Sequence, residues 1–283
     1  MWQAEHVAAR LAAANPRLSV ELVPIGTEGD SRQDVPIAEI GGKGVFAVEI
    51  QRAVADGRAD FAVHSAKDLP PATVSGLTLA CLPSRGDARD AMVGSTIADL
   101  ADGAVVATGS QRRRAHLAHL RPDLTFVELR GNMATRLSKV PSGGAIVVAA
   151  AAFTRLGLYG YLTELLDVDV MIPQVGQGAI AVECRSDDHD THRLLSAIDH
   201  SVTRRCVTAE RAFLAQLGGD CDLPAGAHAT LDTNANIVLS AMLATNGTAS
   251  GQLQQHTEVG PEPDQVGRTA ALHLIDAIDK VGQ

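Results

Sequence analysis

Positive charge is concentrated in one part of an otherwise acidic chain. The 283 residues carry a net charge of −9, but residues 104–155 hold eight cations and two acids, so this segment is +6 and the remainder −15. Only four lysines occur, which makes arginine 20 of the 24 basic residues. A GC-rich genome would favour arginine codons, although it would not gather them in one segment. Because the arginine fork binds a carboxylate through two parallel hydrogen bonds, the pattern predicts a site for planar anions.

Two of these arginines stand at the start of a predicted helix. Residues 108–113 (TGSQRR) join a strand to helix 111–120, with Ser110 as the N-cap. Arg112 and Arg113 oppose the helix dipole, which favours anions at this end. An isolated solvated pair is one interpretation, but a bound polyanion explains the clustering better. Three further arginines lie near strand or loop ends, where each taken singly is typical of a surface residue: Arg130, Arg136 and Arg155.

A carboxylate follows a predicted buried strand. Asp68 comes after strand 59–64 and stands beside Lys67 in the segment HSAKDLPP (64–71). An aspartate in this position is typical of a turn or an N-cap. As a functional group, it would donate a proton or stabilise a cation that develops on a substrate. The residues alone leave both interpretations open.

The four cysteines do not form a framework. No CxxC spacing is present, so neither a disulfide framework nor a zinc site is predicted, and we expect no metal at the site. Cys81 and Cys184 lie in apolar strands, as small core residues do, and Cys206 lies in a predicted helix. Cys221 differs, because residues 217–226 (LGGDCDLPAG) are a loop rich in Gly and Pro, where a ligand can reach a thiol. An ordinary loop cysteine is the alternative.

These residues require elements that bring them together. Over the first two thirds of the chain, apolar runs alternate with amphipathic stretches, which is typical of α/β units around mostly parallel sheets. The expected helices are 3–14, 43–56 and 111–120, and the expected strands are 19–25, 59–64, 77–82, 105–108, 125–128, 145–150 and 178–183. A different pattern then follows, with helices 203–217 and 263–281 around strands 226–232, 236–245 and 252–259. Because ligands bind beyond the carboxyl ends of parallel strands, the loops there predict one anion-binding cleft between two lobes.

Composition excludes several classes of protein. The content of 46% hydrophobic and 20% charged residues is that of an ordinary globular chain, and no apolar run is long enough to span a bilayer. The acidic balance argues against general nucleic-acid binding, and with 3% aromatics an RNA-binding module would lack stacking platforms. With no secretory signal visible, we expect a cytoplasmic protein. A two-lobed anion-binding protein stays open as an alternative to an enzyme.

Seven stretches of the sequence occur together and in order in one known family. They are GGKGVF (41–46), DGRADFAVHSAKDLP (56–70), GDARDAMV (86–93), TGSQRRRAHL (108–117), RPDLTFVELRGNMATRLSK (121–139), PQVGQGAIAVECR (173–185) and TAERAFLAQLGGDCDLPAGAHA (208–229). Through them the chain resembles the hydroxymethylbilane synthase (porphobilinogen deaminase) family. The resemblance covers nearly the whole chain, and the ordered set is far more specific than any single motif.

The resemblance implies a fold. It implies two α/β lobes that are like those of periplasmic binding proteins, followed by a small C-terminal α+β domain. In this numbering the first domain is 1–84 with 179–197, the second is 85–178, and the third is 198–283. The chain crosses between the two lobes twice. The second domain then contains the arginine-rich segment, and the third contains Cys221.

The resemblance also implies an activity. Such a transferase polymerises four porphobilinogen molecules into hydroxymethylbilane, with loss of ammonia at each addition, for porphyrin (haem) biosynthesis. The chain grows on a dipyrromethane cofactor, which is held by a thioether to a cysteine that Cys221 matches. The implied protein is a cytoplasmic monomer whose partner is the small substrate, with no nucleic-acid or membrane partner. Because each porphobilinogen brings an acetate and a propionate, an arginine-lined cleft in an acidic protein is what this chemistry needs.

Site residues carry over by matching positions. Asp68 matches the family's catalytic aspartate, which would protonate the leaving amine and stabilise the pyrrole cations. The residues that match cofactor contacts are Lys67, Asp68, Ser110, Arg112, Arg113, Arg130 and Cys221. The residues that match substrate contacts are Arg112, Arg113, Arg136 and Arg155.

The start of the sequence departs from the family pattern. Members usually have a strand and loop resembling R-I-x-T-R-x-S-x-L-A-L directly before W-Q-A, whereas here Trp2, Gln3 and Ala4 follow Met1. That segment holds an arginine and a serine that contact cofactor and substrate. Loss of a sheet strand exposes backbone groups of its neighbours. We therefore expect this form to be poorly stable or impaired, with a natural start upstream.

Overall fold

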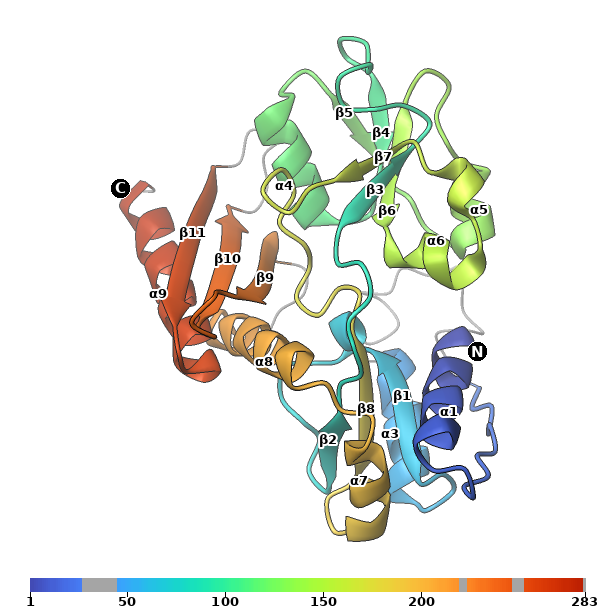
Figure 1. Ribbon diagram of the computed structural model, residues 1–283. Coiled ribbons are helices and arrows are strands. Elements are labelled where there is room, and N and C mark those ends of the chain that lie inside the picture. The colour runs from blue at the N-terminus through green and yellow to red at the C-terminus, as the bar shows by residue number, and fades with distance from the viewer. Residues whose placement is uncertain (27–44, 219–222, 246–251, 282–283) are drawn as a thin grey trace.

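The computed structural model describes residues 1–26, 45–218, 223–245 and 252–281 (Figure 1). Cys221 and most of the GGKGVF motif lie outside these ranges. Three separate sheets organise the described chain, and each has its own helices and core. The predicted α/β class, with two α/β lobes followed by a smaller α+β part, is confirmed. No helix in the described ranges has both the length and the apolar character needed to cross a membrane.

The first sheet contains three strands in the order β1-β8-β2. These are β1 (Phe61–Ser65), β2 (Leu77–Cys81) and β8 (Ile180–Arg185), and the nearby helices are α1 (Trp2–Ala14), α3 (Val45–Ala55) and α7 (His189–Ser196). Both β1 and β2 pair antiparallel with β8. The prediction of mostly parallel sheets is wrong for these strands, because β8 returns from the second sheet and inserts between two strands that run the other way.

The strand predicted over 19–25 is also wrong. The segment is irregular between α1 and the end of the first described range. Leu18 and Val20 nevertheless pack against the core beneath the first sheet, beside Val7 and Leu11 of α1. Alternating hydrophobicity indicates that one side of an extended segment is buried. Such a segment can bury one side without pairing to a neighbouring strand through backbone hydrogen bonds.

The second sheet has five strands in the order β5-β4-β6-β3-β7. They are β3 (Asp90–Val93), β4 (Val105–Ala107), β5 (Thr125–Val127), β6 (Ala145–Ala149) and β7 (Glu164–Leu166), with helices α4 (Gln111–Leu120), α5 (Met133–Leu137) and α6 (Ala151–Leu156) and the 3₁₀ helix η2 (Tyr159–Tyr161). Strand β4 is parallel to β5 and β6, whereas β3 is antiparallel to β6 and β7. Side chains of β6 alternate between two cores, since Val147 packs on one face and Ile146 on the other.

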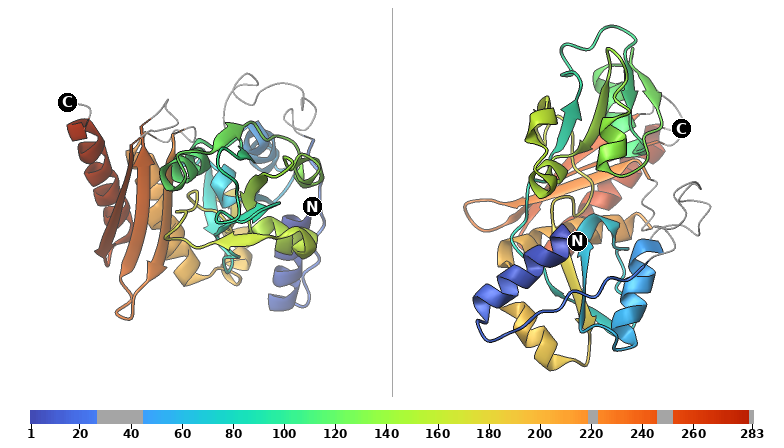
Figure 2. Two further views of the ribbon diagram at one scale, coloured as in Figure 1. Left: turned by 90° about the horizontal axis from the view of Figure 1, so that it is seen from above. Right: turned by 90° about the vertical axis from the view of Figure 1, so that its right-hand side faces the viewer.

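The third sheet is an antiparallel meander covered by two helices. Its strands are β9 (Ala225–Leu231), β10 (Ile237–Ala244) and β11 (Leu253–Gly260), and the helices are α8 (Ser201–Gln216) and α9 (Pro263–Val281). Figure 2 shows α9 on one side of this sheet and elements of the second sheet on the other. The two helices approach closely at Gly267, where a Cβ would collide with the carbonyl oxygen of Ala209 and the backbone nitrogen of Phe213. All five predicted elements are confirmed.

A buried ion pair joins the third part of the chain to the two connections between the lobes. Arg85 lies in the first connection, and its Nη1 and Nη2 donate to the two carboxylate oxygens of Glu210 on α8, at 2.5 and 3.1 Å. Glu210 is fully buried, and it also accepts from the backbone N–H groups of Gly176 in the second connection (2.8 Å) and Ala229 in β9 (2.9 Å). One carboxylate therefore fixes four segments.

This arrangement predicts a large loss of stability in Glu210→Ala. Removal of the carboxylate leaves the Arg85 guanidinium and two backbone donors without their acceptor, which costs about 3–5 kcal/mol for a buried pair. Urea denaturation followed by circular dichroism measures the change. Glu21→Ala, at an exposed position, is the matched control and should stay within about 0.5 kcal/mol of the parent. A Glu210→Ala midpoint equal to that of the control would contradict the assigned role.

Candidate active site

A buried carboxylate holds the first turn of α4. Asp90, at the start of β3, is fully buried and accepts from Arg112 Nη2 at 2.6 Å and from Arg113 Nη2 at 2.8 Å. Gln177 Nε2 donates to the same carboxylate at 3.0 Å. Burial by itself would raise the pKa of Asp90, but the charges of the two arginines and these hydrogen bonds outweigh it and hold the pKa well below its usual range.

Asp90 changes the interpretation of the arginine pair. Arg112 and Arg113 are buried, and their remaining Nη1 atoms donate to the carbonyl oxygens of Ile172 (2.7 Å) and Val147 (3.0 Å). An internal carboxylate therefore supplies the anion that the sequence indicated at the start of this helix. Ser110 caps the helix as expected, since its Oγ accepts from the backbone N–H of Arg113.

The charge of Asp68 acts on cations from three elements. It ends the 3₁₀ helix η1 (Ala66–Asp68), is exposed, and stands beside the half-buried Lys67. Burial lowers the pKa of Arg136 on α5 and of Arg155 on α6, and the negative charge of Asp68 opposes the shift in both. The charge of Arg113 also acts on Lys67 and Arg136. The fold thus brings five of the residues singled out in the sequence into one electrostatic group.

The cations around Asp68 retain donors for a ligand. Among the described residues, Lys67 Nζ and the terminal nitrogens of Arg136 have no hydrogen-bond partner, because Arg136 uses only Nε, which donates to the Gly131 carbonyl oxygen at 2.8 Å. Arg155 Nη2 donates weakly to the Gly178 carbonyl oxygen at 3.3 Å, and its guanidinium carbon lies 5.8 Å from the centre of the Trp2 ring. Partly buried cations with free donors fit a ligand that bears several carboxylates.

Lys67 has an unusual acidity. Burial lowers the pKa of its ammonium group to about 8, with the carboxylate of Asp68 opposing the shift and the charge of Arg113 adding to it. An unfolded lysine titrates near 10.4. The charged lysine therefore destabilises the fold below pH 8, and the effect disappears as the pH rises from 8 to about 10.4. A bound carboxylate would oppose this shift.

A small cavity opens beside Lys67 on the side of the third sheet. Its lining includes Lys67, Gln174, Arg211, Leu223 and Ala225. Leu223 is two positions after Cys221 in the sequence. Arg211 was not singled out in the sequence, where it is one of many helix arginines; its Nη2 donates to the Pro71 carbonyl oxygen at 2.8 Å.

The remaining predicted residue, Arg130, lies at the surface. Its side chain is 55% exposed, and its Nε is 3.8 Å from a carboxylate oxygen of Glu128. No contact among the described residues ties it to the group around Asp68. Sequence reasoning also assigned no role to Asp90 or Gln177, although both occur in stretches that match the family, GDARDAMV and PQVGQGAIAVECR.

Comparison with known proteins decides the family. Residues 1–193 match the family model "Porphobilinogen deaminase, dipyromethane cofactor binding domain", and residues 204–276 match "Porphobilinogen deaminase, C-terminal domain". This chain belongs to the porphobilinogen deaminase family. It is 48% identical over 267 residues to the porphobilinogen deaminase of Roseiflexus sp. (strain RS-1), covering 93% of this chain and 87% of that protein. It is 45% identical over 282 residues to that of Syntrophotalea carbinolica, covering 97% and 89%.

Solved structures show a looser likeness. One is YhfZ from Shigella flexneri, with a TM-score of 0.36 and 15% identity over 76% of this chain and 91% of that one. Another is a TRAP periplasmic solute binding protein from Sulfitobacter sp. nas-14.1, with a TM-score of 0.38 and 10% identity over 76% and 80% of the two chains. Scores below 0.5 add nothing to the argument about function.

The expectations drawn from the resemblance are confirmed at the level of family and reaction. The chain is a transferase of the porphobilinogen deaminase type, and its first part is a dipyrromethane cofactor-binding domain. Its reaction is the tetrapolymerisation of porphobilinogen in tetrapyrrole biosynthesis. The partly buried cations around Asp68 fit the carboxylates of such a cofactor.

The lowered pKa of Lys67 predicts selective labelling. At pH 8 about half of the Lys67 side chains are neutral, compared with about 0.4% of an ordinary lysine. In protein without the cofactor, whose carboxylates would oppose the shift, a limiting amount of an acetylating reagent should therefore modify Lys67 faster than the exposed Lys139, as read by peptide mass spectrometry. The advantage should shrink as the pH rises toward about 10.4, where half of an ordinary lysine is neutral. Lys67→Arg removes the labelled peptide and is the control; equal rates at pH 8 would contradict the prediction.

Proposed function

We propose that Asp68 and the cations around it form the centre at which this porphobilinogen deaminase condenses porphobilinogen into hydroxymethylbilane. The observation that supports this is one exposed carboxylate whose charge acts on three partly buried cations, Lys67, Arg136 and Arg155, which keep free donors among the described residues. A negative charge in a partly desolvated site acts strongly on a cation that develops beside it. Asp68 would stabilise the positive charge left on the substrate when ammonia departs, after protonating the leaving amine.

The surrounding cations would bind the substrate's carboxylates. Arg136 and Arg155 come from different helices, so they can orient two carboxylates of one pyrrole ring or of neighbouring rings. Arg113 is held in place by Asp90, and we assign it the role of adding positive charge to the group around Asp68. Arg112 is buried against Asp90, and we assign it a positioning role. The exposed Arg130 would take a carboxylate from the solvent side.

We propose Cys221 as the attachment point of the cofactor. Its neighbour in sequence, Leu223, lines the cavity that Lys67 also lines, which supports contact between the cofactor and the group around Asp68. Dipyrromethane, when bound, supplies the pyrrole carbon on which the chain grows. Because the growing chain stays attached to the protein, its end does not have to be bound again from solution before each addition. Lys67 and Ser110 would help to bind its carboxylates and orient it.

We also propose three domains, 1–84 with 179–197, 85–178 and 198–283. The three sheets support this division, because each sheet draws its strands from one of these ranges. The family resemblance supports a monomer in the cytoplasm, with porphobilinogen as the partner and neither nucleic acid nor membrane.

The intact mass of the denatured protein tests the attachment. The parent chain should carry an excess equal to two porphobilinogen-derived pyrroles, and Cys221→Ala should have the bare chain mass. Cys206→Ala, at a buried helical thiol, is the matched control and should keep the excess. Acidic p-dimethylaminobenzaldehyde should colour only the chains that keep it. A parent with the bare mass, or an excess that persists in Cys221→Ala, would contradict the assignment.

Asp68→Asn tests the catalytic carboxylate. The substitution keeps the shape of the side chain but removes its charge, so we expect kcat to fall about 100- to 1,000-fold. Only molecules that carry the cofactor mass should be compared, which separates catalysis from loss of the cofactor. Asp169→Asn, at an exposed position, is the control and should leave the rate unchanged. A rate within a few-fold of the parent would remove Asp68 from the mechanism.

A further inference from the structure

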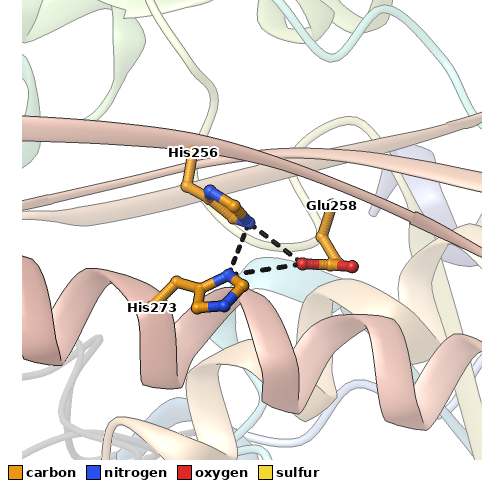
Figure 3. A group of neighbouring side chains, drawn as sticks. All are labelled: His256, Glu258 and His273. Carbon is orange, nitrogen blue, oxygen red and sulfur yellow. Dashed lines mark hydrogen bonds and ion pairs between the residues drawn. The ribbon is translucent and has the colours of Figure 1, made fainter.

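Two histidines and a glutamate converge on the third sheet, on elements that carry none of the residues assigned above (Figure 3). His256 and Glu258 are two positions apart in β11, so both side chains point to the same face of the strand. That face is the one that α9 packs against, and α9 supplies His273. The three side chains therefore come from two elements that the core of this part already holds together.

The three ligand atoms are too close for hydrogen bonds to satisfy all of them. His256 Nε2 lies 3.0 Å from Glu258 Oε2, His273 Nδ1 lies 2.9 Å from His256 Nε2, and His273 Nδ1 lies 3.4 Å from Glu258 Oε2. With Glu258 ionised, each contact to the carboxylate requires a proton on the histidine nitrogen. The contact between the two nitrogens requires that only one of them carries a proton. Every arrangement of protons thus leaves one repulsive contact.

A divalent cation removes this conflict. We propose that His256, Glu258 and His273 bind a transition-metal dication of the Zn²⁺ class, with one lone pair from each side chain directed at the metal. Ligand atoms bonded at 2.0–2.1 Å in a tetrahedral site lie roughly 3.3 Å from one another, so the two shorter separations need to open by only a few tenths of an ångström. Two imidazole nitrogens and a carboxylate oxygen suit zinc, whereas Mg²⁺ and Ca²⁺ prefer all-oxygen ligands.

The burial of the ligands favours binding from solvent. His256 and Glu258 are 29% and 22% exposed, whereas His273 is 56% exposed and leaves a path for entry. Three protein ligands leave a fourth position for water. The absence of cysteine from the set explains why cysteine spacing could not indicate this site.

The position of the site indicates a structural role. The metal would link the edge strand β11 to α9, far from α5 and α6, which carry Arg136 and Arg155 (Figure 1). A metal that binds the folded chain and not the unfolded chain raises stability in proportion to the logarithm of its concentration. The bound metal would therefore stabilise the third part of the chain without entering the reaction.

Cobalt titration tests the site on the full chain, after removal of any affinity tag and of bound metals with a chelator. Co²⁺ should give visible d–d absorption that saturates at one ion per chain, and Zn²⁺ should displace it. Zn²⁺ should also raise the melting midpoint of the protein. Absence of the absorption together with a midpoint that Zn²⁺ leaves unchanged would overturn the proposal.

Variants decide which residues hold the ion. His273→Ala and Glu258→Gln should each weaken Co²⁺ binding at least tenfold and reduce the melting shift caused by Zn²⁺. His192→Ala, an exposed histidine on α7, is the matched control and should bind as the parent does. Melting without metal confirms that each variant folds, and because His273 is exposed its removal should be tolerated. Unchanged binding in both His273→Ala and Glu258→Gln would place the ion elsewhere and overturn the proposal.

Discussion

The buried carboxylate of Asp90 is the charge around which the cation-rich part of the chain is arranged. It accepts from Arg112, Arg113 and Gln177, which lie on α4 and on the second connection between the lobes. A buried ion with a partner removed costs several kcal/mol, so these segments are held in one arrangement. The start of α4 is thereby fixed, and with it the positive charge that reaches Lys67 and Arg136. Glu210 performs the corresponding task for the third part of the chain.

Six of the seven arginines of residues 104–155 fall into two groups with different tasks. Four of them pair with carboxylates of the protein and hold loops and helices in place: Arg112, Arg113, Arg114 and Arg121. Arg136 and Arg155 instead experience the charge of Asp68 and, among the described residues, keep donors for a ligand. The same planar group serves both tasks because it binds any correctly oriented carboxylate, whether from the protein or from a pyrrole.

The proposed metal site, like the arginine pair at Asp90, brings side chains from different segments together around one charged group. Arg112 and Arg113 converge on the carboxylate of Asp90, the charge of Asp68 acts on a group of partly buried cations, and two histidines and a glutamate meet between β11 and α9. Asp90 is supplied by the chain itself. For the other two places we propose counter-ions from outside the chain, which are the carboxylates of cofactor and substrate around Asp68 and a metal ion at β11 and α9.

The sequence by itself determined the family, because seven stretches in a fixed order carry more information than any one residue. It also determined most helices and strands and the Ser110 cap, which depend on local propensity and periodicity. Strand direction in the first sheet was decided by the tertiary structure, since β8 comes back from the second sheet between β1 and β2. The same holds for the partner of Arg112 and Arg113, the lowered pKa of Lys67 and the meeting of His273 with His256. Each depends on groups at least 17 positions apart in sequence coming close together, and no local pattern records such contacts.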